Sequence, residues 1–293
     1  MDTIRSVSEY LECLSKIKME PKTTFSVGCF TLFRGQANAN WLLSPSLYRQ
    51  NLFEAENLLL TEIKHICPKE FGDNRFDSLV KMQHFGMPTR LLDVTTNPLV
   101  SLYFACESSE QSNEDGIVYI FPNMPVSWSN DLLVDLVMDF VYDYFPRKMW
   151  LDQMLDQSRK KYGNGSYRLM PDTIDSLLHY LTIPAFAVMP AKTNERVEAQ
   201  DGAFFVFGMH FSNREVSTNP GTIGRVYYNF EPIEIDNVQQ IWKKTETLRI
   251  PAAAKKGILN QLDILGINER KLFPDLSHQI NHTVRTVKAH MIK

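Results

Sequence analysis

Four side chains of different chemistry lie within ten residues of one another in the segment 83–93. They are the imidazole of His84, the hydroxyl of Thr89, the guanidinium of Arg90 and the carboxylate of Asp93. The segment is otherwise apolar enough to be buried, and an unpaired polar group in a core costs roughly 1–3 kcal/mol. These groups therefore need partners. Either they pair with one another, with Asp93 capping the next helix and bonding Arg90, or they line a site for a ligand.

Arg34 is a further candidate, because we expect it at the end of a strand. Gly35 follows it and would let a ligand approach the backbone, and Gln36 adds a side-chain amide. A guanidinium offers planar, paired donors that suit a phosphate or a diphosphate. The alternative is a structural Arg34 that pairs with a carboxylate such as Asp93.

Apolar periodicity predicts the elements that position these side chains. We expect helices over 2–19, 54–70 and 74–82, the last capped by Asn74, and a short helix opened by Asn97 and Pro98. Strands are expected at 25–33, 116–121, 183–189, 203–207 and 225–230, with an exposed connector at 208–221.

The architecture that follows is one α+β domain over residues 1–293, with a mostly antiparallel sheet as its core. Helices precede the sheet, interrupt it and follow it. Residues 130–182 are expected to form a helical insertion between strands, and residues 250–293 a C-terminal helical segment.

Composition narrows the classes of protein. A hydrophobic share of 44% with 22% charged residues is ordinary for a chain that fills a globular core, and the net charge of −3 argues against a broad basic surface. No apolar run approaches the roughly 18–20 residues that cross a bilayer, and the first residues lack the features of a signal peptide. The four cysteines have no metal-site or redox spacing, which predicts reduced thiols in a cytoplasmic protein.

Other chemistries find little support. His278 and His282 have helical i, i+4 spacing, but no third ligand accompanies them, so we expect no metal site. The chain has neither a phosphate-binding glycine loop nor a nucleophile-elbow serine.

Several segments resemble the FRG-domain family. The family's first motif corresponds to Phe33-Arg34-Gly35, and the specific part of the likeness is the segment 83–93. The remaining correspondences are 41–47 with Arg49, 97–100, 115–119, Arg196 with Gln200 and Gly202, and 272–276. The likeness covers nearly the whole chain apart from the helical insertion. The family occurs in bacteria and phages, in proteins of toxin, toxin–antitoxin or phage-defence character, and its layout is similar to that of ADP-ribosyltransferases.

This resemblance implies a transferase that uses NAD and modifies a macromolecule, either nucleic acid or protein. Arg34 would hold the diphosphate, His84 and Thr89 would contact the ribose and the nicotinamide, and Arg90 and Asp93 would brace the floor. His84 could also act as a catalytic acid or base, because the ordinary pKa of an imidazole is about 6.5. Gly35, Gln36 and Arg196 would complete the cofactor-binding set. A regulatory protein such as an antitoxin would be a partner, and no membrane is implied.

The group that serves the anomeric carbon stays open. A carboxylate is favoured, because positive charge develops on the sugar as its glycosidic bond breaks. Glu198 is the carboxylate that we favour, whereas the family's pattern points to Gln200, whose neutral amide can position a ribose but supplies no charge. Asp93 could be the acid instead, and Glu198 could be a solvated loop residue.

Two other functions are compatible with the sequence. The domain could be a catalytically inactive module that binds a nucleotide or nucleic acid through Arg34 and Arg90. It could also be a nuclease-like toxin that uses Asp93 and His84 with a metal ion.

Overall fold

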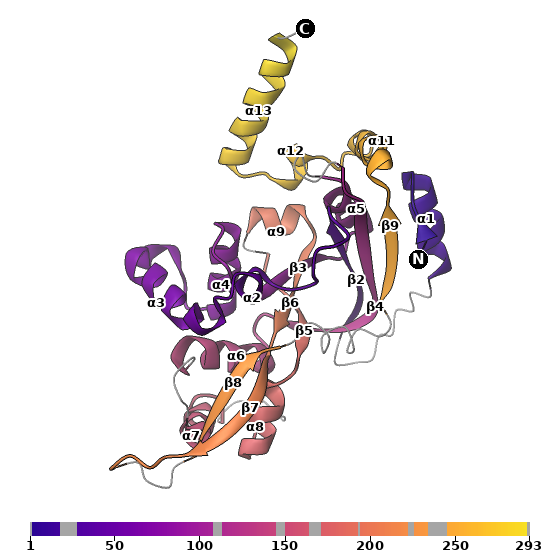
Figure 1. Ribbon diagram of the computed structural model, residues 1–293. Helices are drawn as coiled ribbons and strands as arrows, with labels where there is room; N and C mark the ends of the chain where they lie inside the picture. The colour runs from indigo at the N-terminus through magenta and orange to yellow at the C-terminus, as the bar shows by residue number, and fades with distance from the viewer. Residues whose placement is uncertain are drawn as a thin grey trace.

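A sheet that closes on itself forms the centre of the molecule (Figure 1). The computed structural model describes residues 2–17, 28–107, 113–144, 150–163, 171–192, 194–221, 226–233 and 245–291. The sheet has the strand order β1-β9-β4-β2-β3-β6-β5. Its strands are β1 (Asp2–Thr3), β2 (Cys29–Gln36), β3 (Leu91–Thr95), β4 (Gly116–Trp128), β5 (Ala185–Met189), β6 (Gly202–Phe207) and β9 (Glu246–Ile250).

The length of β4 allows the closure. Its first residues, Gly116–Ile120, pair with β9, and its last residues, Val126–Trp128, pair in parallel with β5. Between them, Asn123 has a φ of 55°, and the register with β2 shifts, which bends the strand. Strands β4, β2, β3, β6 and β5 therefore form a closed five-stranded mixed barrel. Within it, all pairings except β4–β5 are antiparallel.

The barrel interior follows the two-residue period of its strands. Leu92 and Val94 of β3 point inward, whereas Leu91 on the same strand belongs to the outer core. Large and small side chains alternate across neighbouring strands, which fills a narrow barrel. The interior cluster includes Leu32, Leu92, Val94, Phe121, Val126, Ala185, Ala187, Ala203, Phe205 and Phe207.

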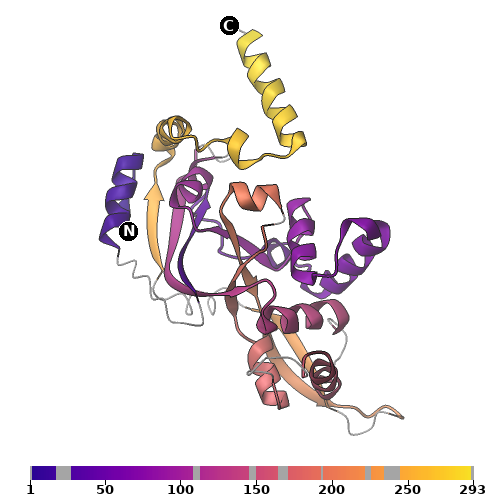
Figure 2. The ribbon, with the colours of Figure 1, turned by 180° about the vertical axis from the view of Figure 1, so that it is seen from behind.

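Helices α5 (Pro98–Cys106), α1 (Val7–Lys16) and α11 (Ala252–Ile264) cover one side of the sheet (Figure 2). Two glycines permit the closest contact. A Cβ at Gly35 of β2 would lie 1.8 Å from the carbonyl oxygen of Ser101, and one at Gly116 would lie 2.0 Å from that of Ala105. Gly35 is thus required for the packing of α5 on β2.

A second group of helices packs against the outer face of β3, β5 and β6. It includes α4 (Arg75–His84) and the helices within 130–182, and the hairpin β7–β8 packs there through Phe230 on Phe140. Its other elements are α3 (Glu56–Ile66), α6 (Leu132–Asp139), the π-helix η3 (Phe140–Tyr144), α7 (Leu151–Tyr162), α8 (Ile174–Leu181), β7 (Met209–Val216) and β8 (Val226–Pro232).

Short elements and the C-terminal helices complete the fold. The 3-10 helices are η1 (Phe53–Ala55) and η2 (Pro68–Glu70), and short α-helices are α2 (Ser46–Arg49), α9 (Glu195–Ala199) and α12 (Glu269–Leu272). The final helix, α13 (Leu276–Met291), extends away from the rest of the chain in both views (Figures 1 and 2).

The predicted α+β class with N-terminal, inserted and C-terminal helices is confirmed, but the sheet is a mixed barrel. The exposed connector predicted at 208–221 is wrong, because residues 209–216 form β7. That strand is polar, and its backbone is satisfied in a two-stranded hairpin outside the barrel. Residues 91–95 form β3, and residues 195–199 form a helix rather than a loop.

Candidate functional site

A cavity of about 410 Å³ opens between β2, β3 and helices α4, α5 and α9. Strands β2 and β3 pair only at Phe33 and Thr95, so they separate beyond this point and leave the opening. The cavity is lined by Arg34, Gly35, Gln36, Gln83, His84, Asp93, Glu107, Arg196 and Gln200 among polar residues, and by Phe33, Trp41, Phe104 and Phe204 among aromatic ones. Segments more than 160 positions apart in sequence thus meet at one site.

Arg34 bridges the two separated strands. Its Nη1 donates to the carbonyl oxygen of Asp93 at 2.6 Å, and its Nε donates to Oε1 of Gln36 at 3.1 Å. The amide of Gln36 is held in turn by donating to the carbonyl of Trp41 at 3.0 Å. No carboxylate of the described chain forms an ion pair with Arg34. Burial lowers the pKa of this guanidinium to about 10, while the charge of Asp93 favours the protonated form. Arg34 therefore remains cationic at neutral pH.

A chain of hydrogen bonds fixes the carboxylate of Asp93. The backbone N–H of Leu91 donates to Oγ1 of Thr89 at 3.2 Å, and the Thr89 hydroxyl donates to Oε1 of Gln83. Nε2 of Gln83 then donates to Oδ1 of Asp93 at 2.9 Å. This chain sets the orientation of the Gln83 amide and leaves Oδ2 of Asp93 available to a ligand. Gln83, which the sequence pattern alone does not identify, lies at the centre of this chain of hydrogen bonds.

Helix α9 brings Arg196 and Gln200 to the cavity. Asn194 caps it by accepting from the N–H groups of Arg196 and Val197. The hydroxyl of Thr95 donates to the carbonyl oxygen of Gln200 at 2.7 Å, so the end of β3 holds the end of α9. The side-chain amide of Gln200 donates to the carbonyl of Leu272 at 3.0 Å.

The guanidinium of Arg196 lies 4.5 Å from the ring centroid of Phe273 and forms no ion pair with any described carboxylate. Burial lowers its pKa, and the nearby charges of Asp93 and Asp275 oppose this effect. Arg196 is therefore a partly desolvated cation without a direct anionic partner, which is the condition that favours an anionic ligand.

His84 is the last residue of α4, where Gly86 with a φ of 90° ends the helix. Burial lowers the pKa of the imidazole below its ordinary value, and the charge of Arg196 lowers it further, against the effect of Asp275. His84 is therefore neutral at pH 7 and able to accept a proton.

The structure separates the other predicted residues from the cavity. Arg90 is completely buried and binds Glu56 on α3, with Nε 2.8 Å from Oε1, and its Nη1 donates to the carbonyl of Phe207. Thr89 is buried and acts on the cavity only through Gln83. Glu198 is exposed and does not line the cavity. Among carboxylates, the cavity instead contains Asp93 and Glu107.

A second cavity of about 530 Å³ adjoins the first and shares Val80, His84 and Arg196 with it. Its charged lining is mainly acidic, with Lys81 paired to Glu70 at 2.9 Å. The carboxylates that line it are Glu70, Asp73, Asp77, Glu195 and Asp275.

The described residues contain no group of three or more His, Cys, Asp or Glu side chains that could hold a metal ion. His278 and His282 are paired with Asp275 and Glu269. All four cysteines are free. Within the part of the chain that the structure covers, no helix has the length and apolar character to cross a membrane.

Residues 30–114 match the FRG domain family, whereas comparison with curated proteins and with solved structures gave no significant match. The matched range begins in β2 and ends just before β4, so it contains Arg34, Gln83, His84 and Asp93. Arg196 and Gln200 reach the same cavity from outside it. The likeness seen in the sequence is thus supported over residues 30–114.

Proposed function

We propose that the 410 Å³ cavity binds NAD and that the protein transfers ADP-ribose to a macromolecule, as an effector of the toxin or phage-defence type. The observation that carries the proposal is the convergence of Arg34, Arg196, His84, Asp93 and Gln200 on this one cavity. Two cations without carboxylate partners suit a diphosphate. The aromatic side chains give apolar surface to a base or a nicotinamide, and the volume is within the usual range of ligand pockets, about 300–1,000 Å³.

The lining of the cavity favours Asp93 as the carboxylate that takes part in the reaction. NAD would supply the ADP-ribosyl group, with the C1′–N bond to nicotinamide breaking as a nucleophile of the acceptor bonds to C1′. Positive charge that develops on the sugar is stabilised by a preorganised carboxylate. Asp93 lines the cavity and is held by Gln83, whereas Glu198 does not line the cavity.

His84 would accept the proton of the acceptor's nucleophile, because its lowered pKa leaves the imidazole neutral at pH 7. It lies between the two cavities, so an acceptor would approach from the second one. The acidic lining there repels phosphates, and this favours a protein acceptor over RNA or DNA.

The test is incubation of the protein with NAD labelled in the adenylate and with cell extract, followed by protease or nuclease treatment. We expect protease-sensitive label, which is lost with Arg34→Ala and reduced by at least about tenfold with Asp93→Asn. Glu198→Gln is the matched control and should retain activity. If the wild-type chain neither transferred label nor bound NAD, the proposal would be contradicted. Nuclease-sensitive label would contradict only the choice of a protein as the acceptor.

A second candidate function is a nucleotide-binding module without catalysis. Two observations favour it. Glu198, the carboxylate that the sequence favoured for catalysis, does not line the cavity, and the side-chain amide of Gln200 already donates a hydrogen bond to the carbonyl of Leu272. Binding of ADP-ribose that depends on Arg34 and Arg196, with no transfer of label, would identify this case.

A further inference from the structure

Helix α13 contacts its own chain through its polar face. Nε2 of Gln279 donates to the carbonyl oxygens of Arg270 and Phe273, each at 2.7 Å. Nδ1 of His282 lies 3.1 Å from Oε2 of Glu269 on α12. This is the reverse of the usual arrangement, in which a surface helix turns its apolar face toward the core.

The opposite face of α13 carries an apolar stripe that is open to solvent. Its five side chains are between 45% and 80% exposed, and they fall within about 80° of the helix circumference. Figures 1 and 2 show α13 extending beyond the other described elements, so these elements leave the stripe uncovered. The stripe consists of Leu276, Ile280, Val284, Val287 and Met291.

The spacing of the stripe indicates the kind of partner. Ile280, Val284, Val287 and Met291 are separated by four, three and four residues, which is the spacing of a coiled-coil seam. A helix that lies in a membrane surface presents a broader apolar face, usually with aromatic residues, and the stripe has none. A second helix is therefore the better fit.

We propose that the stripe is covered by α13 of a second copy of this chain, in antiparallel orientation. The pattern is self-complementary: Ile280 of one copy packs level with Met291 of the other, and Val284 packs level with Val287. In this register Leu276 lies beyond the end of the partner's α13, so the other four side chains of each copy form the seam. Together they would bury somewhat less than about 1,000 Å², which is the size of a weak, reversible interface.

The orientation follows from size and charge. A helix of 16 residues is only about 24 Å long, so a parallel pair would force the two larger bodies together at one end. In the antiparallel pair the bodies lie at opposite ends, and exposed Lys288 of one copy lies near uncharged Asn281 of the other. This interface is separate from both cavities and does not depend on the proposed function.

The experiment is sedimentation velocity of the full chain from about 1 to 100 µM, a range suited to a weak, reversible interface at the lower size limit. We expect a reversible monomer–dimer equilibrium, which Val284→Asp combined with Val287→Asp weakens at least about tenfold. Circular dichroism would verify that the variant remains folded. Asn281→Asp tests the orientation. It also adds a negative charge to α13, but beside the seam, and it should tighten the dimer several-fold through Lys288 of the other copy.

A wild-type chain that stays monomeric at 100 µM would overturn the proposal. So would a dimer that the Val284→Asp and Val287→Asp pair leaves unchanged, or a monomer that binds phosphatidylserine vesicles through α13. If Asn281→Asp did not tighten the dimer, the antiparallel orientation would be wrong.

Discussion

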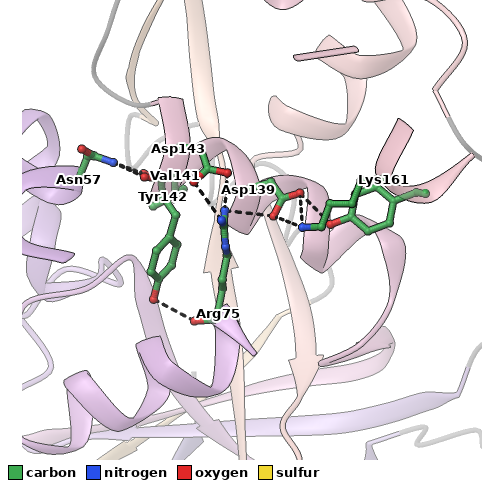
Figure 3. Close-up of polar contacts among 8 residues, drawn as sticks. Asn57, Arg75, Asp139, Val141, Tyr142, Asp143 and Lys161 are labelled. Carbon is green, nitrogen blue, oxygen red and sulfur yellow. Dashed lines mark hydrogen bonds and ion pairs between the residues drawn. The ribbon is translucent and has the colours of Figure 1, made fainter. Parts of the chain in front are cut away.

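The arginines at the two ends of α4 have contrasting surroundings. At the start of α4, Arg75 binds both oxygens of Asp143 and lies 3.1 Å from Oδ1 of Asp139, which also accepts from Lys161 (Figure 3). Near its end, Arg34 and Arg196 have no such carboxylate among the described residues. Carboxylates of the protein thus complete the ion pairs of Arg75, whereas Arg34 and Arg196 form an incomplete group that lacks a carboxylate partner in the part of the chain that the structure describes.

The pKa values of the guanidiniums express this difference. Burial acts against the charge of Arg75, but the hydrogen bonds and charges of Asp143 and Asp139 raise its pKa above the ordinary value. The pKa values of Arg34 and Arg196 are lowered by burial that no ion pair offsets. Burying a charge without a partner is costly, so a protein that keeps two of them near one cavity favours an anion there.

Arg90 is the extreme of the complete type, and its partner gives the largest expected effect. Glu56→Leu removes the carboxylate from a completely buried guanidinium and should lower the free energy of unfolding by about 3–5 kcal/mol. Urea denaturation measures it. The double variant Glu56→Leu with Arg90→Met should recover most of the loss, and a double variant as unstable as the single one would contradict the account.

The network around Asp139 should give a smaller loss of stability. Asp139→Asn weakens the contacts with Arg75, Lys161 and the hydroxyl of Tyr162, while Arg75 keeps Asp143. We expect a decrease of about 2 kcal/mol in the free energy of unfolding, because Asp139 is buried but its partners Arg75 and Lys161 are partly exposed. Lys161→Met, which removes a half-exposed partner, is the control and should cost less than about 1 kcal/mol.

The incomplete group should respond in the opposite way. Arg196→Gln should weaken the binding of ADP-ribose by about tenfold, since one charged hydrogen bond is lost, and change the free energy of unfolding by less than about 1 kcal/mol. Isothermal titration calorimetry and urea denaturation measure the two quantities. A large loss of stability with unchanged affinity would place Arg196 with Arg75 as a structural residue.

The smallest expected effect is a pH dependence of binding. The pKa of His84 is lowered in the free protein, and an anion bound beside it would raise that pKa. Binding then takes up a proton, so affinity for ADP-ribose should increase a few-fold as the pH falls from about 8 to about 5.5. His84→Gln should remove most of this dependence, and an unchanged profile in that variant would exclude His84 as its source.

Local signals in the sequence predicted much of the fold. Asn74 and Asn97 cap helices as expected, and Pro98 lies in the first turn of α5. Closure of the barrel could not be predicted, because it depends on a bend at Asn123 and on a short parallel pairing between β4 and β5. Polar β7 lacks the apolar alternation that identifies a strand.

The candidate site was predicted in part. The pattern of chemical groups around Arg34 and Asp93 identified two segments that line the cavity. The same pattern could not show that Asp93 lines the cavity while Arg90 does not. Residues separated by an odd number along a strand point to opposite faces, but the sequence did not predict that residues 91–95 form a strand. The partner of Arg90 is Glu56, a distant residue that no local pattern connects with it.

The support of Arg196 and Gln200 comes from the C-terminal part of the chain. The side chain of Gln200 donates a hydrogen bond to Leu272, and the guanidinium of Arg196 lies against the ring of Phe273. Leu272 and Phe273 follow the cavity residues that they contact by more than seventy positions in the sequence. During synthesis, the amino-terminal part of a chain emerges first. A ribosome-bound chain that has reached only α11 contains every residue of the cavity lining but not the segment that steadies one wall. The ligand binding that we propose for this cavity would therefore reach full strength only after translation has passed residue 273.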